Sequence, residues 1–95
     1  MTFGHQPVAL RRAVTGRERI VIRRARGADS DALRRLADLA DRPVPPVPVL
    51  LAEADGDLVA AVSTRTGSIV SDPFVASDDV VALLRLRANQ LDAAA

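Results

Sequence analysis

The sequence predicts a small α+β domain: a mostly antiparallel sheet of about four strands with two helices, in the order β-α-β-β-β-α. Apolar residues recur at helical spacing in two segments, from residue 29 to about 41 and from residue 77 to about 91. Short apolar runs lie between these segments, and an Asp-Gly pair separates two of the runs as a tight hairpin turn does. At 95 residues, the chain has room for a single domain.

The first strand is predicted at residues 20–25, whose side chains alternate between two faces. The helix that follows is expected to begin where the side chain of Asp29 or Ser30 accepts hydrogen bonds from the free N–H groups of the first turn. Its buried face should contain Leu33, Leu36, Ala37 and Ala40. The helix should end near Asp41, because the prolines that follow cannot continue it.

Residues 43–49, PVPPVPV, are expected to be extended and stiff. Pro45, Pro46 and Pro48 supply the PxxP spacing of ligands that bind aromatic grooves. A rigid connection into the next strand is the favoured interpretation, since it needs only ordinary loop chemistry.

The clearest local signal is a hairpin of residues 49–54 and 57–64 around Asp55 and Gly56, because glycine tolerates the positive φ of such a turn. A second turn then leads into a short strand at residues 68–71. The two hairpin strands are apolar at successive positions, which indicates a sheet covered on both faces. One helix alone is not expected to cover both.

The last helix is expected to begin after Ser77 as its cap. Its apolar stripe comprises Val80, Leu83, Leu84, Ala88 and Leu91. At about 100° per residue, Arg87 also falls within this stripe. Arg87 either contacts an anion or partner, or extends to the rim or pairs with Glu53 or Asp72, and the second interpretation is favoured. Leu86 points to the otherwise polar side.

Composition excludes several classes of function. Without Cys, Tyr or Trp, the chain has no disulfide, thiol nucleophile, thiolate metal site or phenolic acid. It contains neither an apolar run long enough for a membrane span nor a signal peptide, so a cytoplasmic location without a membrane partner is expected. All 13 basic residues are Arg, which is typical of a GC-rich bacterial genome.

Charge is distributed unevenly along the chain. Residues 1–26 carry a net charge of +6 and residues 27–95 a net charge of −5. We interpret residues 1–18 as a flexible basic arm and residues 19–95 as the single folded domain. Such an arm could neutralise nucleic-acid phosphates. A solubilising role, or contact with the acidic body, is favoured because no helix that could read bases accompanies the arm.

The runs IVIRRARGADSDALRRLADL and LLAEADGDLVAAVS resemble the opening of the GNAT acetyltransferase superfamily, in which an Ile-Arg-x-Ala strand leads to an Asp-xxx-Leu-xx-Leu helix. The matching positions are Ile22, Arg23, Ala25, Asp29, Leu33 and Leu36. The resemblance covers about residues 20–91 and implies a GNAT-like half domain. The family's C-terminal strands, and the Tyr that many members use as an acid, have no counterpart in this sequence.

The same resemblance implies where acetyl-CoA would bind. In the family, a loop like RxxGxG cradles the pyrophosphate at a helix N-terminus. The corresponding residues 75–81, VASDDVV, contain neither Gly nor Arg. Ser77 and Asp78 would occupy the N–H groups, and the carboxylates of Asp78 and Asp79 would repel a diphosphate. We therefore expect no cofactor, and the sequence leans away from an enzyme without deciding the question.

The sequence thus predicts a non-catalytic interaction module that forms a homodimer or binds a protein partner. The candidate interaction residues are Ile69 and Val70 at the sheet edge, with Leu86 and Arg87 on the last helix. An acetyltransferase completed by another chain is the alternative, and nucleic-acid binding by the arm is a weaker one. No catalytic or metal-binding residue is predicted, since His5 stands alone and turns or caps explain the Asp pairs.

Overall fold

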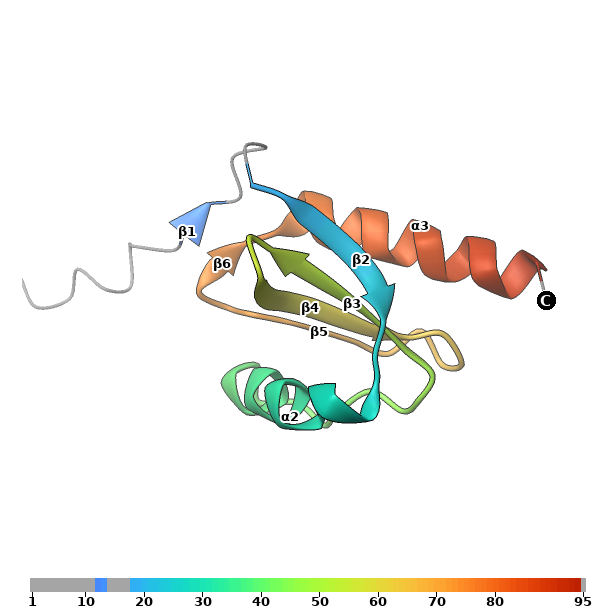
Figure 1. Ribbon diagram of the computed structural model, residues 1–95, viewed down its shortest axis with the longest axis horizontal. Coiled ribbons are helices and arrows are strands. Elements are labelled where there is room, and N and C mark those ends of the chain that lie inside the picture. Colours follow the sequence, from blue (N-terminus) through green and yellow to red (C-terminus); the bar gives the residue numbers. More distant parts are fainter. Residues whose placement is uncertain (1–11, 14–17, 95) are drawn as a thin grey trace, which may run out of the picture.

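The computed structural model describes residues 12–13 and 18–94. Its elements are β1 (Arg12–Ala13), β2 (Ile20–Arg24), the 3₁₀ turn η1 (Gly27–Asp29), α2 (Ser30–Leu39), β3 (Val49–Ala54), β4 (Asp57–Ser63), β5 (Ile69–Ser71), β6 (Val75–Ala76) and α3 (Asp78–Ala94) (Figure 1). The main sheet has the order β2-β3-β4-β5, and each neighbouring pair is antiparallel. The predicted α+β class, with two helices and a four-stranded antiparallel sheet, is confirmed.

The hairpin between β3 and β4 turns through two residues, as predicted. Asp55 and Gly56 both have positive φ, 50° and 87°, which matches the twist of the flanking strands. Asp55 also binds the residue just before β2, because its Oδ1 accepts a hydrogen bond from the Arg19 N–H at 2.9 Å. The turn therefore fixes the register of three strands.

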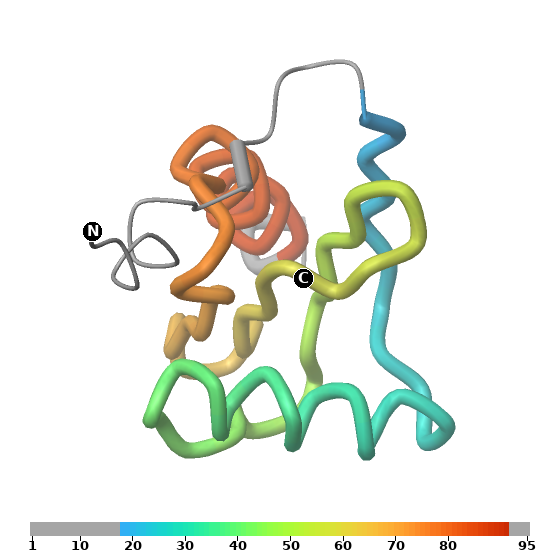
Figure 2. Tube along the Cα trace, turned by 90° about the vertical axis from the view of Figure 1, so that its left-hand side faces the viewer, coloured from blue at the N-terminus to red at the C-terminus, as the bar shows by residue number. Residues whose placement is uncertain are grey.

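The two helices cover opposite faces of the sheet. Figure 1 shows α2 below the strands and α3 on the opposite side of them, and Figure 2 shows α2 at the bottom with α3 at the upper left. On the α3 face, the buried cluster includes Leu50, Val62 and Leu84. On the α2 face, a second cluster includes Leu36 and Leu51. The prediction that both faces are covered, and that one helix would not suffice, is confirmed.

A β-bulge in β4 places two successive residues on the face of the sheet that packs against α3. Ala52 of β3 pairs with Ala60, whereas the next residue, Glu53, pairs with Leu58, so Val59 has no partner in β3. Val59 and Ala60 both belong to the α3 cluster, while Leu58 packs against the α2 cluster. The extra residue is accommodated without reversing the faces on either side of it.

The segment interpreted as a basic arm is described at three positions. Arg12 and Ala13 form β1, which pairs in parallel with Val75 and Ala76 of β6. Glu18 is a half-buried bend residue just before β2. The other residues of this arm, and His5 among them, lie outside the described part of the chain, so its flexibility stays a prediction.

The N-terminus of α2 differs from the prediction. Neither Asp29 nor Ser30 caps the first turn of α2 through its side chain. Instead, Asp29 accepts bonds from both terminal nitrogens of Arg23, at 2.8 and 2.9 Å, and from the Arg26 N–H at 2.7 Å. The bidentate ion pair outcompetes helix capping, because a guanidinium offers two donors in the geometry that a carboxylate accepts. The pair ties β2 to the start of α2.

Glu53 of β3 completes this ion cluster. Its Oε2 lies 3.3 Å from Arg23, whose side chain is about one quarter exposed. The pKa of Arg23 is raised by its bonds to Asp29 and Glu53, while the Arg23 guanidinium and the Arg26 N–H hold the pKa of Asp29 well below its usual value. Strand β2, the turn η1 at the start of α2, and strand β3 thus meet at one guanidinium.

The C-terminus of α2 closes in a Schellman motif. Asp41 adopts φ of 53°, and the Arg42 N–H donates to the Ala37 carbonyl at 3.0 Å. The helix proper ends at Leu39, close to the predicted end. In the proline-rich segment beyond it, Pro45 is fully buried, so the native fold does not present the PxxP spacing to an aromatic groove.

We expect Asp29→Asn to destabilise the protein at neutral pH more than at acid pH. The pKa of Asp29 is lower in the folded than in the unfolded protein, where it is about 3.9. The unfolded chain therefore binds this proton more readily, and the stabilisation is fully present above about pH 5 and is lost as the pH falls. Urea unfolding of the variant and the wild type at pH 7 and pH 3 measures the difference between them.

Asp31→Asn serves as the control: it removes the exposed Asp31–Arg34 pair and one charge in the first turn of α2, so its cost at pH 7 should be only about 0.5 kcal/mol, well below that of Asp29→Asn. An Asp29→Asn effect of equal size at both pH values would contradict the role of the charge.

We expect Asp41→Gly to raise the free energy of unfolding by up to about 1 kcal/mol, since glycine adopts positive φ without the steric cost of a Cβ. Asp55→Gly is the matched comparison, because Asp55 also has positive φ but would lose its bond to the Arg19 N–H. Thermal unfolding should rank Asp41→Gly above the wild type and Asp55→Gly below Asp41→Gly. A less stable Asp41→Gly variant would show that the turn is not strained.

Candidate functional site

The outer edge of β5 is the first candidate surface. The Ser63 N–H donates to the Ser68 carbonyl and the Asp72 N–H to the Val59 carbonyl, so residues 68, 70 and 72 face β4. Ile69 and Ser71 therefore direct their backbone N–H and C=O groups away from the sheet, where the described residues supply no partner strand. The predicted sheet edge exists, and its free groups belong to Ile69 and Ser71.

Val70 does not take part in that edge. Its side chain is only 2% exposed and packs in the cluster beneath α2. Ile69 is half-buried and packs against the α3 cluster, so only its backbone is directed outward. Of the two edge residues named from the sequence, one is available to a partner and the other stabilises the core.

Two exposed apolar side chains near this edge were not identified from the sequence. Phe74, in the turn just after β5, is 58% exposed, and Leu39 at the end of α2 is 51% exposed. We call Ile69, Ser71, Phe74 and Leu39 the β5 surface. Nothing in the spacing of Leu39 marked it as exposed, whereas Phe74 follows Pro73 in a segment that leaves the sheet, which is a usable signal.

Leu86 and Arg87 lie on another part of the molecule. Leu86 is 52% exposed, about half a turn of the helical wheel away from the buried residues Val80, Leu84 and Ala88. Arg87 is exposed and lines a groove beside β2, which is the opposite edge of the sheet from β5. The structure therefore does not bring the four predicted interaction residues together.

Arg87 does not pair with either predicted carboxylate. Glu53 is bound by Arg23 on the α2 face, and Asp72 accepts a hydrogen bond from the Phe74 N–H at 2.8 Å. Arg87 projects instead from α3, on the other face. The predicted pairing with Glu53 or Asp72 is therefore wrong, because the sheet separates Arg87 from Glu53.

The head of α3 carries the acidic turn identified in the sequence. Ser77 is buried, and its carbonyl accepts the Val81 N–H at 2.9 Å, so α3 begins where predicted. Asp78 and Asp79 occupy the exposed first turn and border a hollow of about 250 Å³. Their negative charge stabilises the positive end of the helix and repels an anionic ligand there.

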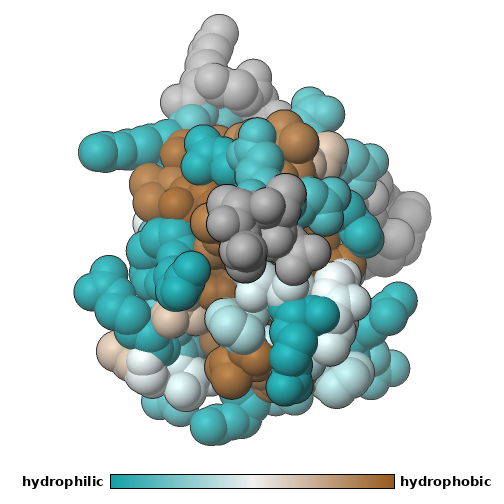
Figure 3. All heavy atoms as spheres, turned by 90° about the vertical axis from the view of Figure 1, so that its right-hand side faces the viewer, coloured by the Kyte–Doolittle hydropathy of each residue, from teal (hydrophilic) through white to brown (hydrophobic). Residues whose placement is uncertain are grey.

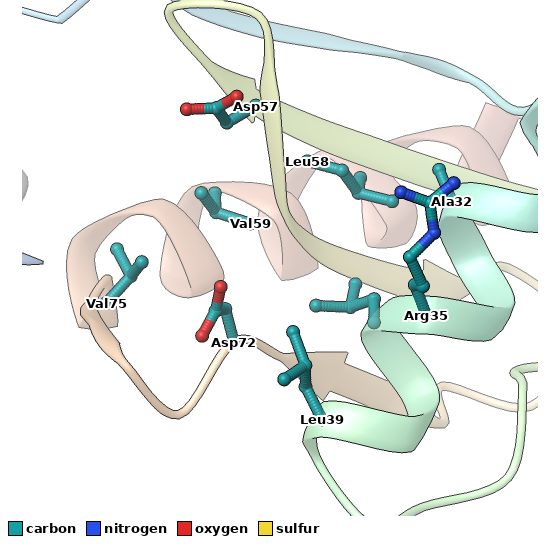
Figure 4. A pocket seen from close by; sticks show the side chains of 9 residues that line it. Ala32, Arg35, Leu39, Asp57, Leu58, Val59, Asp72 and Val75 are labelled. Carbon is teal, nitrogen blue, oxygen red and sulfur yellow. The ribbon is translucent and has the colours of Figure 1, made fainter.

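A larger hollow, of about 360 Å³, lies between α2, the start of β4 and the turn after β5 (Figure 4). Its wall is largely apolar, and Arg35 extends into it from α2, while Asp57 and Asp72 border it on separate segments. Its described lining contains no Ser, Thr or His. The hollow is open to solvent. It shares Leu39 with the β5 surface, and Asp72 directly follows Ser71 of that surface, so we do not treat the hollow as a separate site.

The chain matches no protein-family model, no curated protein and no solved structure. The GNAT resemblance accordingly rests on the sequence motif and on the order of the elements.

Other kinds of site find no support in the described residues. Among the described side chains of residues 18–91, no three carboxylates or histidines gather as metal ligands would. Ser63, fully buried, accepts hydrogen bonds from the Arg65 and Thr66 N–H groups, so its hydroxyl closes a turn. In the same part of the chain, no helix combines the length and apolar character needed to cross a bilayer.

We expect Asp78→Asn with Asp79→Asn to lower the free energy of unfolding by about 0.5 kcal/mol per residue, because each removes a charge that stabilises the start of α3. The loss should shrink at about 1 M salt, which screens exposed charges. Asp38→Asn is a control of opposite sign, since Asp38 lies near the negative end of α2. Denaturant unfolding that gave all three substitutions the same sign would contradict the electrostatic cause.

Proposed function

We propose that this chain is a GNAT-like, non-catalytic module that forms a homodimer through the β5 surface. The observation that carries the proposal is the edge of β5, where Ile69 and Ser71 present N–H and C=O groups without a described partner. An edge of this kind is a template for pairing with another chain. The neighbouring exposed Phe74 and Leu39 would add apolar area to such a contact.

The order of the elements supports the resemblance to the family. A strand, a helix, a hairpin, a further strand and a second helix follow one another as the resemblance implies. The motif residues also have shared roles: Arg23 binds Asp29, and Leu33 and Leu36 pack on the sheet. These roles build the fold and perform no chemistry, so the motif supports a GNAT-like frame more strongly than an acetyltransferase activity.

Two copies would pair their β5 strands around a two-fold axis near Val70. In an antiparallel pair, Ile69 of one copy then faces Ser71 of the other, and each such pair exchanges both N–H···O=C bonds. The result is one continuous sheet across the dimer. The interface is isologous, as is usual for homodimers.

The acidic head of α3 favours this function over the enzyme alternative. Asp78 and Asp79 stand where the family resemblance places the acetyl-CoA pyrophosphate, and neither lies in an ion pair among the described residues. Two carboxylates at the helix end raise the electrostatic cost of bringing a diphosphate there.

We expect native mass spectrometry of the full chain to give a dimer that Ser71→Pro converts to monomer. The Ser71 N–H points out of the sheet, so proline removes a donor needed by the partner and leaves the β4–β5 bonds in place. Ser71→Ala is the matched control, because it removes the hydroxyl and keeps the N–H. Circular dichroism checks that each variant is folded, and Phe74→Ser provides a second, exposed substitution that should weaken the dimer.

The same spectra recorded with acetyl-CoA separate the alternatives. The module is expected to give an unchanged dimer mass. A wild-type monomer at working concentration would overturn the dimer, and a stoichiometric acetyl-CoA adduct would favour an enzyme completed by another chain.

A further inference from the structure

A groove of about 390 Å³ runs between β2 and the C-terminal half of α3, at the edge of the sheet opposite β5. Its floor is apolar and is formed by Ile22, Leu50 and Leu91. Arg24, Arg87 and Gln90 add polar groups along it. Figure 3, which views the right-hand side of Figure 1, where α3 ends, shows hydrophobic surface among hydrophilic side chains.

The groove carries positive charge that the described residues do not neutralise. Arg24 and Arg87 are exposed, and neither lies in an ion pair with a described side chain of residues 18–91. Arg23 also lines the groove, but its guanidinium lies on the other face of the sheet and is bound by Asp29 and Glu53. Two free guanidinium groups above an apolar floor are complementary to a ligand that is both anionic and apolar.

The backbone of β2 adds a third feature. The Asp55 N–H donates to the Arg19 carbonyl and the Ala25 N–H donates to the Val49 carbonyl, so the odd-numbered residues of β2 face β3. Ile20, Ile22 and Arg24 therefore direct their N–H and C=O groups outward, along the groove. Apart from the Arg24 carbonyl, which accepts from Arg23 at 3.3 Å, no described residue binds these groups.

We propose that this groove binds an extended acidic peptide segment of a partner protein, which adds to β2 as a further strand. The segment's backbone would bond to Ile20, Ile22 and Arg24, as in other cases of strand addition. Side chains two residues apart lie on the same face of a strand, so one carboxylate would reach Arg24 or Arg87 while an apolar neighbour fills the floor.

Charge determines the choice of occupant. The chain's own N-terminal segment is basic, with Arg11, Arg12 and Arg17 before β2, and would be repelled by the two free arginines. A segment from an acidic partner is attracted by them. Because β2 and β5 are opposite edges of the sheet, the groove stays accessible in the dimer proposed above, and the two proposals fail independently.

The test is fluorescence anisotropy with the full chain and labelled, amidated peptides. The probes are Thr-Glu-Thr-Leu-Thr-Val and the same residues in reverse order, which cover both strand directions. The matched peptides carry Gln in place of Glu. We expect one of the acidic probes to bind with Kd below about 1 mM, and its Gln counterpart to bind about tenfold more weakly.

Variants locate the binding. Arg24→Gln and Arg87→Gln should each weaken the acidic probe roughly fivefold and leave the Gln probe nearly unchanged. Arg85→Gln is the matched control, since Arg85 is exposed on the same helix and does not line the groove. Two further probes carry N-methyl groups on the odd-numbered or on the even-numbered backbone nitrogens. One of the two should lose binding and the other should keep it, because only alternate N–H groups of an added strand face β2.

Binding weaker than about 1 mM by both acidic probes would overturn the proposal. Equal losses in Arg85→Gln and Arg87→Gln would also overturn it, because they would show a diffuse attraction to positive charge. Loss of probe binding in Ser71→Pro would place the peptide at the β5 edge and so contradict a site at β2.

Discussion

The bidentate bond between Arg23 and Asp29 is the constraint on which the arrangement of the other elements depends. It joins the C-terminal end of β2 to the start of α2, and the contact of Arg23 with Glu53 extends it to β3. With α2 held across one face of the sheet, Leu33 and Leu36 reach the apolar strands beneath them. A chain with few aromatic residues fills its core with Leu, Val and Ala, whose close packing depends on elements being held in register.

This ion cluster also separates two arginines that are neighbours in the sequence. Alternation along β2 sends Arg23 to the α2 face, where carboxylates bind it, and leaves Arg24 beside α3 without a partner among the described residues. Arg87 joins Arg24 from the helix. Because successive side chains of a strand point to opposite faces, Arg23 stabilises the fold while its neighbour Arg24 remains available for recognition.

Much of the fold could be predicted because the signals are local. The Asp-Gly turn, the helical spacing of Leu33 and Leu36, and the acidic first turn of α3 each depend on a few adjacent residues. The candidate site was less predictable. Whether Ile69 or Val70 presents its backbone depends on the register between β4 and β5, and the separation of Arg87 from Glu53 depends on which face each strand residue occupies. Such facts follow from pairing over long sequence distances, which no short pattern encodes.

The bulge at Val59 gives the chain a position where its length can change by one residue. Glu53 would still face Leu58, and Ala52 would still face Ala60, if Val59 were deleted, so the hairpin could keep its register. The Val59 carbonyl, however, holds the Asp72 N–H at 2.9 Å and thereby anchors the turn that carries Phe74. The one extra residue of β4 is therefore dispensable for the register of the hairpin, but it positions the turn beside β5.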